Sequence, residues 1–225
     1  MNIPLPLEGK KKIIVVSEAH HSKFPFPFRG RGKGRGFKML RIIAGSARGR
    51  RFEAPEGRDT RPTLDRVREN LFNMLQGKTL DARTLDLFAG SGALSLEALS
   101  RGAAFAVLAD RDREAIRVEK KNIAALGFEE KTRVLQSEWK NTLRALSAEG
   151  EKFDLIFLDP PYVMTDLREV TERLLPLMAE ESWIVIEHQA KAQVQVAEGL
   201  GLVKERTWGY CGVKIYEQLR DSGFL

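Results

Sequence analysis

Short apolar segments alternate with amphipathic segments through the middle of the chain, and this alternation limits the fold more than any other feature of the sequence. The apolar segments predict strands at residues 84–88, 105–109, 132–135, 153–158 and 183–187. Apolar residues at helical spacing predict helices at about 92–101, 113–126, 139–148 and 167–178. Strands this apolar, each followed by a helix, are typical of a parallel sheet covered on both faces. The sequence therefore predicts an α/β fold.

The C-terminal part follows a different pattern. Two strand-like segments, 202–208 and 213–219, are separated by 209–212, which predicts an antiparallel hairpin. Together with the five parallel strands, this hairpin makes a seven-stranded, mostly parallel sheet. We assign residues 81–225 to this domain.

Composition supports a globular protein without a membrane span. The chain has 225 residues, of which 43% are hydrophobic, and can bury a full core. No apolar segment approaches the roughly 20 residues needed to cross a bilayer, and no secretory cleavage site is recognisable. The single Cys211 cannot form an internal disulfide, which fits a reducing cytoplasm. We expect a cytoplasmic monomer with no metal site.

Charge is distributed unevenly along the sequence. Residues 1–80 hold 18 Lys and Arg against 7 Asp and Glu, whereas residues 81–225 hold 19 against 24. A basic front joined to a mildly acidic body favours contact with a nucleic acid, although charge that only aids solubility is the alternative. Residues 1–38 include the segment 29–36, in which Gly alternates with Arg or Lys, and they predict a basic, disordered extension that is dispensable for catalysis. A start codon assigned too early, with Met39 as the true start, is the alternative.

Residues 39–80 predict a small hairpin followed by a basic helix. Glycines 45 and 49 divide the apolar stretches of 41–54, and Leu64, Val67, Leu71 and Leu75 then recur at helical spacing. Pro62 lies near the start of this helix, Gly77 ends it, and we expect its polar face to show Arg66 and Arg68. The candidate RNA contacts of the segment are Arg48, Arg50, Arg51, Arg61, Thr63, Arg66 and Arg68. About half should touch nucleic acid, and the others should pair with Asp65, Glu69 or Glu53.

A glycine turn follows the first predicted strand of the α/β domain. In the run 85–94, Gly90 and Gly92 permit close approach of a ligand, and Asp86 lies near the strand end. Asp110 ends the next strand, where a carboxylate can accept both ribose hydroxyls. A dinucleotide-binding site uses the same arrangement and remains open, although Ser95 stands where its third glycine would be. The candidate cofactor-binding residues are Asp86, Phe88, Ala89, Gly90, Ser91, Gly92, Asp110, Arg111, Ser137, Glu138 and Asp159.

A second motif, Asp159-Pro160-Pro161-Tyr162, follows the fourth predicted strand. Asp159 and the Pro160 carbonyl can accept both N–H groups of an exocyclic base amine, which frees the nitrogen lone pair for a methyl carbon. Pro161 stiffens the turn, and Tyr162 can stack on the base. An ordinary proline turn is the alternative. With the glycine turn, these four candidate catalytic residues indicate methyl transfer from S-adenosylmethionine to a base amine.

At these residues the chain resembles the bacterial 16S rRNA methyltransferases that modify N2 of guanine 966. The resemblance runs from Met39 to about Leu219 and rests on 41–45, 48–50, 61–63, 65–69, 71–73, the glycine segment through 103, and 159–162. It implies a class I Rossmann-like fold, S-adenosylmethionine as cofactor, and 16S rRNA in an assembled or assembling 30S particle as substrate. The extension 1–38 and Glu138-Trp139, where Asp or Asn and a small residue are usual, depart from the family pattern.

Two other functions remain open at this point. A DNA adenine-N6 or cytosine-N4 methyltransferase uses the same four-residue turn, although no separate target-recognition domain is evident. Guanine offers N1–H beside its amine, whereas adenine and cytosine offer a bare ring nitrogen, and the sequence does not locate the group that would distinguish them. A non-catalytic RNA-binding module is the other alternative.

Overall fold

The computed structural model describes residues 39–54 and 61–219, and the side chains of all of these except 61–64. These residues belong to one compact unit, Gly36–Leu225, so the predicted boundary between residues 80 and 81 falls inside it. The predicted extension, residues 1–38, lies outside the described residues.

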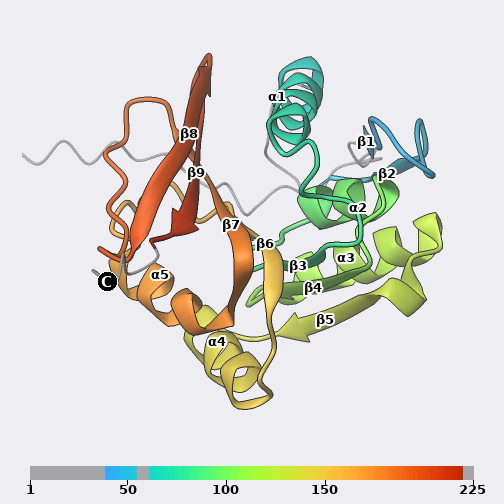
Figure 1. Ribbon diagram of the computed structural model, residues 1–225. Helices are drawn as coiled ribbons and strands as arrows, with labels where there is room; N and C mark the ends of the chain where they lie inside the picture. The colour runs from blue at the N-terminus through green and yellow to red at the C-terminus, as the bar shows by residue number, and fades with distance from the viewer. Residues whose placement is uncertain (1–38, 55–60, 220–225) are drawn as a thin grey trace, which may run out of the picture. The chain divides into compact units, whose positions relative to one another are not determined.

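A seven-stranded sheet in the order β5-β4-β3-β6-β7-β9-β8 forms the centre of the unit (Figure 1). The first five strands are parallel, and β9 pairs antiparallel with both β7 and β8, which confirms the predicted sheet. The strands are β3 (Arg83–Asp86), β4 (Phe105–Asp110), β5 (Thr132–Gln136), β6 (Phe153–Leu158), β7 (Met178–Gln189), β8 (Leu200–Trp208) and β9 (Cys211–Gln218). The chain runs outward from β3 to β5 and returns to β6 on the other side of β3. The switch point, where ligands bind in such sheets, therefore lies at the carboxyl end of β3, where β4 leads to one side and β6 to the other.

Helices cover both faces of the sheet (Figure 1). The helices are α1 (Arg61–Met74), α2 (Ala93–Ser100), α3 (Arg113–Leu126), α4 (Trp139–Ala148) and α5 (Arg168–Leu174), with short 3-10 turns at Glu129–Lys131 and Leu175–Leu177. One core cluster joins the sheet to α1, α2 and α3, and the other joins it to α4 and α5. Strands β3, β4 and β6 are buried on both sides, as their apolar sequences predict, whereas β5 at the sheet edge is only partly buried.

Several element boundaries differ from the prediction. The helix expected over 167–178 ends at Leu174, because Pro176 has no N–H to continue it, and β7 begins at Met178 instead of residue 183. The strand expected over 84–88 ends at Asp86. The C-terminal hairpin turns through Gly209 and Tyr210 alone, which is shorter than the four residues predicted.

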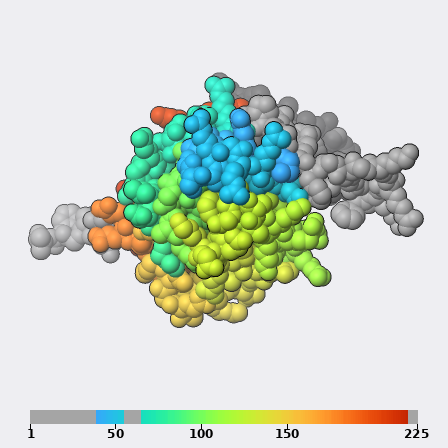
Figure 2. Space-filling model, turned by 90° about the vertical axis from the view of Figure 1, so that its right-hand side faces the viewer, coloured from blue at the N-terminus to red at the C-terminus, as the bar shows by residue number. Residues whose placement is uncertain are grey.

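The predicted N-terminal hairpin and helix are present. Strands β1 (Met39–Arg41) and β2 (Arg51–Glu53) pair antiparallel, with Leu40 opposite Phe52. Val67, Leu71 and Leu75 are buried, as their helical spacing predicts. The hairpin lies against α3, where the Arg50 guanidinium donates to the carbonyls of Ala125 and Leu126 (Figure 2).

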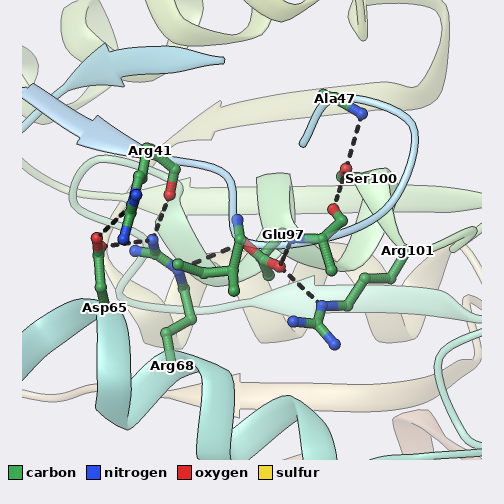
Figure 3. Close-up of polar contacts among 9 residues, drawn as sticks. Arg41, Ala47, Asp65, Arg68, Glu97, Ser100 and Arg101 are labelled. Atoms are coloured by element: carbon green, nitrogen blue, oxygen red, sulfur yellow. Dashed lines mark hydrogen bonds and ion pairs between the residues drawn. The ribbon is translucent and has the colours of Figure 1, made fainter. Parts of the chain in front are cut away.

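The buried carboxylate of Glu97, on α2, holds this N-terminal segment in place (Figure 3). It accepts hydrogen bonds from the backbone N–H groups of Ile43 and Ala44 at 2.8 and 3.0 Å. It also accepts one from the Arg101 side chain at 2.7 Å and lies 3.5 Å from Nε of Arg68. Ser100, one turn further along α2, donates to the Ala44 carbonyl. One buried ionic network therefore joins three elements: helix α1, helix α2 and the loop that follows β1.

The prediction that Arg68 lies on the exposed face of the basic helix is wrong. Its side chain is 5% exposed, donates to the Arg41 carbonyl and pairs with Asp65 at 3.1 Å as well as with Glu97 (Figure 3). The helical period places Arg68 next to Val67 on the inner side, where Glu97 compensates its charge. Burial lowers the pKa of Arg68, and the attraction of Glu97 and Asp65 opposes this effect.

We expect Glu97→Gln to lower the free energy of unfolding by about 3–5 kcal/mol, because it removes the charge that compensates a buried arginine. Urea unfolding followed by circular dichroism measures this. The exposed Glu169, which pairs with Lys140 and Arg173, provides the matched control, and Glu169→Gln should leave the unfolding midpoint unchanged. A Glu97→Gln variant as stable as the wild type would contradict the role of the network.

Candidate active site

The glycine turn lies at the carboxyl end of β3, between β3 and α2. Gly90 and Gly92 have positive φ values of 58° and 77°. A Cβ on Gly92 would lie 2.8 Å from Cδ2 of Leu108, whereas a Cβ on Gly90 would meet no atom within 4 Å. The left-handed φ of Gly92 is one that L side chains rarely adopt, and a Cβ there would also push against the end of the Leu108 side chain on β4. Gly90 leaves open space above the turn, where a ligand can approach the backbone.

Asp110 braces this turn from the end of β4. Its Oδ2 accepts a hydrogen bond from the Gly90 N–H at 3.0 Å, and its Oδ1 accepts one from the Asp112 N–H at 2.9 Å. The Asp110 carbonyl accepts from the Ser137 N–H, which follows β5. The structure thus brings the predicted cofactor residues from three strand ends together, while the ribose contact of Asp110 stays a prediction.

Asp86 is the last residue of β3 and is 1% exposed. Its Oδ2 accepts a hydrogen bond from the Ser95 hydroxyl at 3.1 Å. Burial raises the pKa of Asp86 to about 7, and the charges of Asp159 and Asp110 add to the rise although the Ser95 hydrogen bond opposes it. Ser95, which in the sequence only weakened the dinucleotide interpretation, is the direct partner of this carboxyl.

Glu119 is a buried acid that the sequence analysis did not single out. It lies on α3, is 0% exposed, and neither carboxyl oxygen has a hydrogen-bond partner within the described part of the chain. Burial raises its pKa to about 8, and the charges of Asp86 and Asp110 raise it further while Lys120 lowers it. Its spacing of three residues from the buried Ile116 was the available signal, because that spacing puts it on the inner face of the helix.

Asn122, on the next turn of α3, was also missed. Its amide donates to the Ser91 carbonyl at 2.9 Å and to the Glu53 carbonyl at 3.0 Å, and its oxygen accepts from the Glu53 N–H at 2.8 Å. One side chain therefore connects the glycine turn to strand β2 of the N-terminal hairpin.

The Asp-Pro-Pro-Tyr turn follows β6, on the other side of β3 from β4. Asp159 is half-buried and lies near enough to Asp86 for its charge to raise the pKa of that residue. Pro160 is buried, Tyr162 is 43% exposed, and the Pro161 carbonyl accepts from the Met164 N–H at 2.8 Å. The turn and the end of β7 line a small, open pocket.

Several of the other predicted residues lie on the surface, namely Arg48, Arg51, Arg66, Arg111 and Glu138. Arg111 and Glu138 form an exposed ion pair at 3.4 Å, which leaves the adenine contact of Glu138 a prediction. Arg48, Arg51 and Arg66 are exposed, as RNA contacts would be. The side chains of Arg61 and Thr63 are not described.

Over 39–54 and 61–219, no group of three or more His, Cys, Asp or Glu residues could hold a metal ion. In the same part of the chain, no helix is long and apolar enough to span a membrane.

The raised pKa of Glu119 makes stability depend on pH. Unfolding returns this carboxyl to its ordinary pKa of 4.5 from about 8, so between these pH values the folded protein binds more protons than the unfolded chain and loses stability as pH rises. We expect Glu119→Gln to leave the free energy of unfolding unchanged near pH 4 and to raise it by on the order of a few kcal/mol at pH 9. Urea unfolding at both pH values measures this. Glu114→Gln, on the exposed face of the same helix, is the control, and an equal pH profile for Glu119→Gln and wild type would contradict the assignment.

Comparison with known proteins agrees with this geometry. The family model described as conserved hypothetical protein 95 matches residues 40–217. The chain is 37% identical over 190 residues to ribosomal RNA small subunit methyltransferase D of Escherichia coli K12, covering 81% of this chain and 92% of that protein. The corresponding protein of Haemophilus influenzae is 33% identical over 185 residues, covering 79% and 93%.

Solved structures show the same fold. The Escherichia coli protein yhhF superposes with a TM-score of 0.70 at 36% identity, covering 80% of this chain and 98% of that one. The Thermus protein TTHA0928 superposes with a TM-score of 0.66 at 33% identity, covering 78% and 98%. The chain therefore belongs to the family of ribosomal RNA small subunit methyltransferase D, with a class I methyltransferase fold and S-adenosylmethionine as its cofactor.

Proposed function

We propose that this methyltransferase transfers the methyl group of S-adenosylmethionine to the exocyclic N2 amine of a guanine in 16S rRNA, at position 966 of the small ribosomal subunit. The observation that carries the proposal is the parallel pairing of β3 with β6, in which Asp86 lies opposite Phe157, so that the Asp-Pro-Pro-Tyr turn begins two residues beyond the partner of Asp86. The relatives named ribosomal RNA small subunit methyltransferase D support rRNA as the substrate.

The chain's own residues perform two tasks in this reaction. Asp159 and the Pro160 carbonyl accept the two N–H groups of the amine, which favours a pyramidal nitrogen with a free lone pair, and Tyr162 stacks on the base. S-adenosylmethionine supplies, when bound, a methyl carbon that its sulfonium already activates. Positioning therefore provides much of the rate, and Asp159 takes the proton that the nitrogen loses after methylation.

The N-terminal hairpin and α1 supply the proposed RNA contacts. Arg48, Arg51 and Arg66 are exposed on these elements, and the Glu97 network fixes the elements to α2, which begins at the glycine turn. A target base must leave its stack to reach the pocket, so phosphates on either side need to be held. We propose that the protein acts as a cytoplasmic monomer on the 30S subunit or its assembly intermediate.

Asp159→Ala should lower methyl transfer by at least about 100-fold, because it removes the acceptor of the amine and of the released proton. Cofactor affinity, measured by isothermal titration calorimetry, should stay near that of the wild type. The control is Glu130→Gln, which changes an exposed side chain and should retain activity. Asp154 does not serve as a control, because it accepts a hydrogen bond from the Arg83 N–H at 2.8 Å. Turnover that survives Asp159→Ala would exclude the proposed role.

The substrate is identified by tritium transfer from labelled S-adenosylmethionine to 30S particles and to duplex DNA. We expect label in 16S rRNA, recovered as N2-methylguanosine by mass spectrometry of nucleosides, because the relatives are rRNA methyltransferases. Particles from a strain that lacks the corresponding enzyme serve as acceptor. Label in DNA alone would contradict the proposal and favour the adenine or cytosine enzymes.

Neutralising Arg48, Arg51 and Arg66 together should raise the KM for 30S particles and leave cofactor affinity unchanged. Each lost phosphate contact should reduce the slope of log affinity against log salt by about 1. Particle binding measured between low and physiological salt tests this, with Arg168→Ala as the control, because Arg168 lies on α5 and pairs with Asp166. An unchanged slope in the triple variant would show that RNA binds elsewhere.

A further inference from the structure

Strand register places a second carboxylate beside Asp159. Strands β6 and β7 are parallel, and their last paired residues are Leu158 and Ile186. The residue that follows each of these is an acid: Asp159 directly after the end of β6, and Glu187 on β7. Adjacent strands lie about 4.8 Å apart, so the two acids are lateral neighbours at the carboxyl edge of the sheet.

The alternation of side chains puts both acids on the same face. Phe157 and Val185 belong to the core cluster under α1 and α2, whereas Leu158 and Ile186 belong to the other cluster. Residues two positions along a strand share a face, so Asp159 follows Phe157 and Glu187 follows Val185. The effect of Asp159 on the pKa of Asp86, which is paired with Phe157 and lies on that face, agrees with this placement.

Glu187 also lines the pocket next to the proposed catalytic turn. The pocket is bounded by Pro160, Pro161 and Tyr162 on one side and by the end of β7 on the other. No residue of the glycine turn lines it. The pocket therefore places the end of β7, including Glu187, next to the Asp-Pro-Pro-Tyr turn.

The neighbouring polar residue, His188, has a different role. Alternation turns it to the opposite face of β7, and its ring is 6% exposed. Its Nδ1 lies 2.7 Å from the Gln189 carbonyl, which can only accept, so Nδ1 carries the proton and the ring is held by its own strand. Of the two side chains, Glu187 is the one beside Asp159.

A carboxylate at this place distinguishes guanine from the other amine-bearing bases. The guanine amine is flanked by N1–H, a donor, whereas the amines of adenine and cytosine are flanked by a ring nitrogen with a lone pair. An ionised carboxylate can only accept hydrogen bonds, so it attracts the N1–H of guanine and repels the ring-nitrogen lone pair of adenine or cytosine. Resting on the proposed function, we propose that Glu187 is a specificity-determining residue whose carboxylate accepts the N1–H of the target guanine while Asp159 holds the adjacent amine.

The test uses two bases that share the 2-amine but differ at N1. Particles are reconstituted with 16S rRNA that carries either guanosine or 2-aminopurine, which has no N1–H, at the position methylated by the wild type. For the wild type, kcat/KM should be at least about 100-fold higher with guanosine than with 2-aminopurine. The Glu187 carboxylate has no N–H to accept from at N1 of 2-aminopurine. Glu187→Gln should lower kcat/KM for guanosine by about 10- to 100-fold. It should also reduce the ratio of kcat/KM for guanosine to that for 2-aminopurine at least about tenfold, because the Gln amide can donate to N1 of 2-aminopurine.

Two further variants distinguish recognition of the base by Glu187 from a purely structural role of this residue. Glu187→Ala offers neither donor nor acceptor, so it should lower the guanosine rate without lowering the 2-aminopurine rate. Glu217→Gln makes the same chemical change on the exposed side of β9 and should match the wild type on both bases. Calorimetric affinity for S-adenosylmethionine should be equal in all four proteins, which reports that each is folded.

The outcomes of the two proposals are distinguishable. If Glu187→Gln binds cofactor and keeps the wild-type preference for guanosine, the inference about Glu187 is wrong and the proposed function stands. If the wild type transfers no methyl group to guanosine in either rRNA or particles, both are wrong.

Discussion

The buried carboxylate of Glu97 holds the N-terminal hairpin and α1 against α2. Glu97 is 0% exposed, and a charge in that position is tolerated only when it is paired and fully hydrogen-bonded. Its partners come from the loop after β1, from Arg68 on α1 and from Arg101 at the end of α2 (Figure 3). Docking of the basic hairpin and helix is therefore a condition for a stable α2. Since α2 begins at the glycine turn, the proposed RNA surface and the cofactor turn are fixed to one helix.

A second constraint acts at the carboxyl edge of the sheet. Burial raises the pKa of Asp86 to about 7 and that of Glu119 to about 8. The charges of Asp159 and Asp110 add to the rise at Asp86, and those of Asp86 and Asp110 add to the rise at Glu119. The positive sulfonium and ammonium groups of S-adenosylmethionine would offset the repulsion among these acids, which supports the proposed cofactor site at this edge of the sheet. The same edge continues through Asp159 to Glu187.

Local patterns predicted most of the fold and the two motifs. The apolar strands and the residues at their ends were recognisable because burial on both faces requires continuous apolar sequence. The end of α5 at Leu174 was missed, although Pro176 carried the signal. Arg68 and Glu119 were misjudged or missed for another reason. Charged residues on an amphipathic helix are usually exposed, and only a partner or a shifted pKa from distant elements makes a buried position tolerable.

The sequence by itself determined the order of the elements, the glycine turn after one strand and the proline turn after another, because short-range periodicity and turn chemistry encode these features. Only the tertiary structure decided which strand ends are neighbours. It placed β6 beside β3, so that Asp159 affects Asp86, and it set the register that puts Glu187 beside Asp159. Pairing between strands far apart in sequence depends on the packing of the whole sheet, and no local pattern of residues records it.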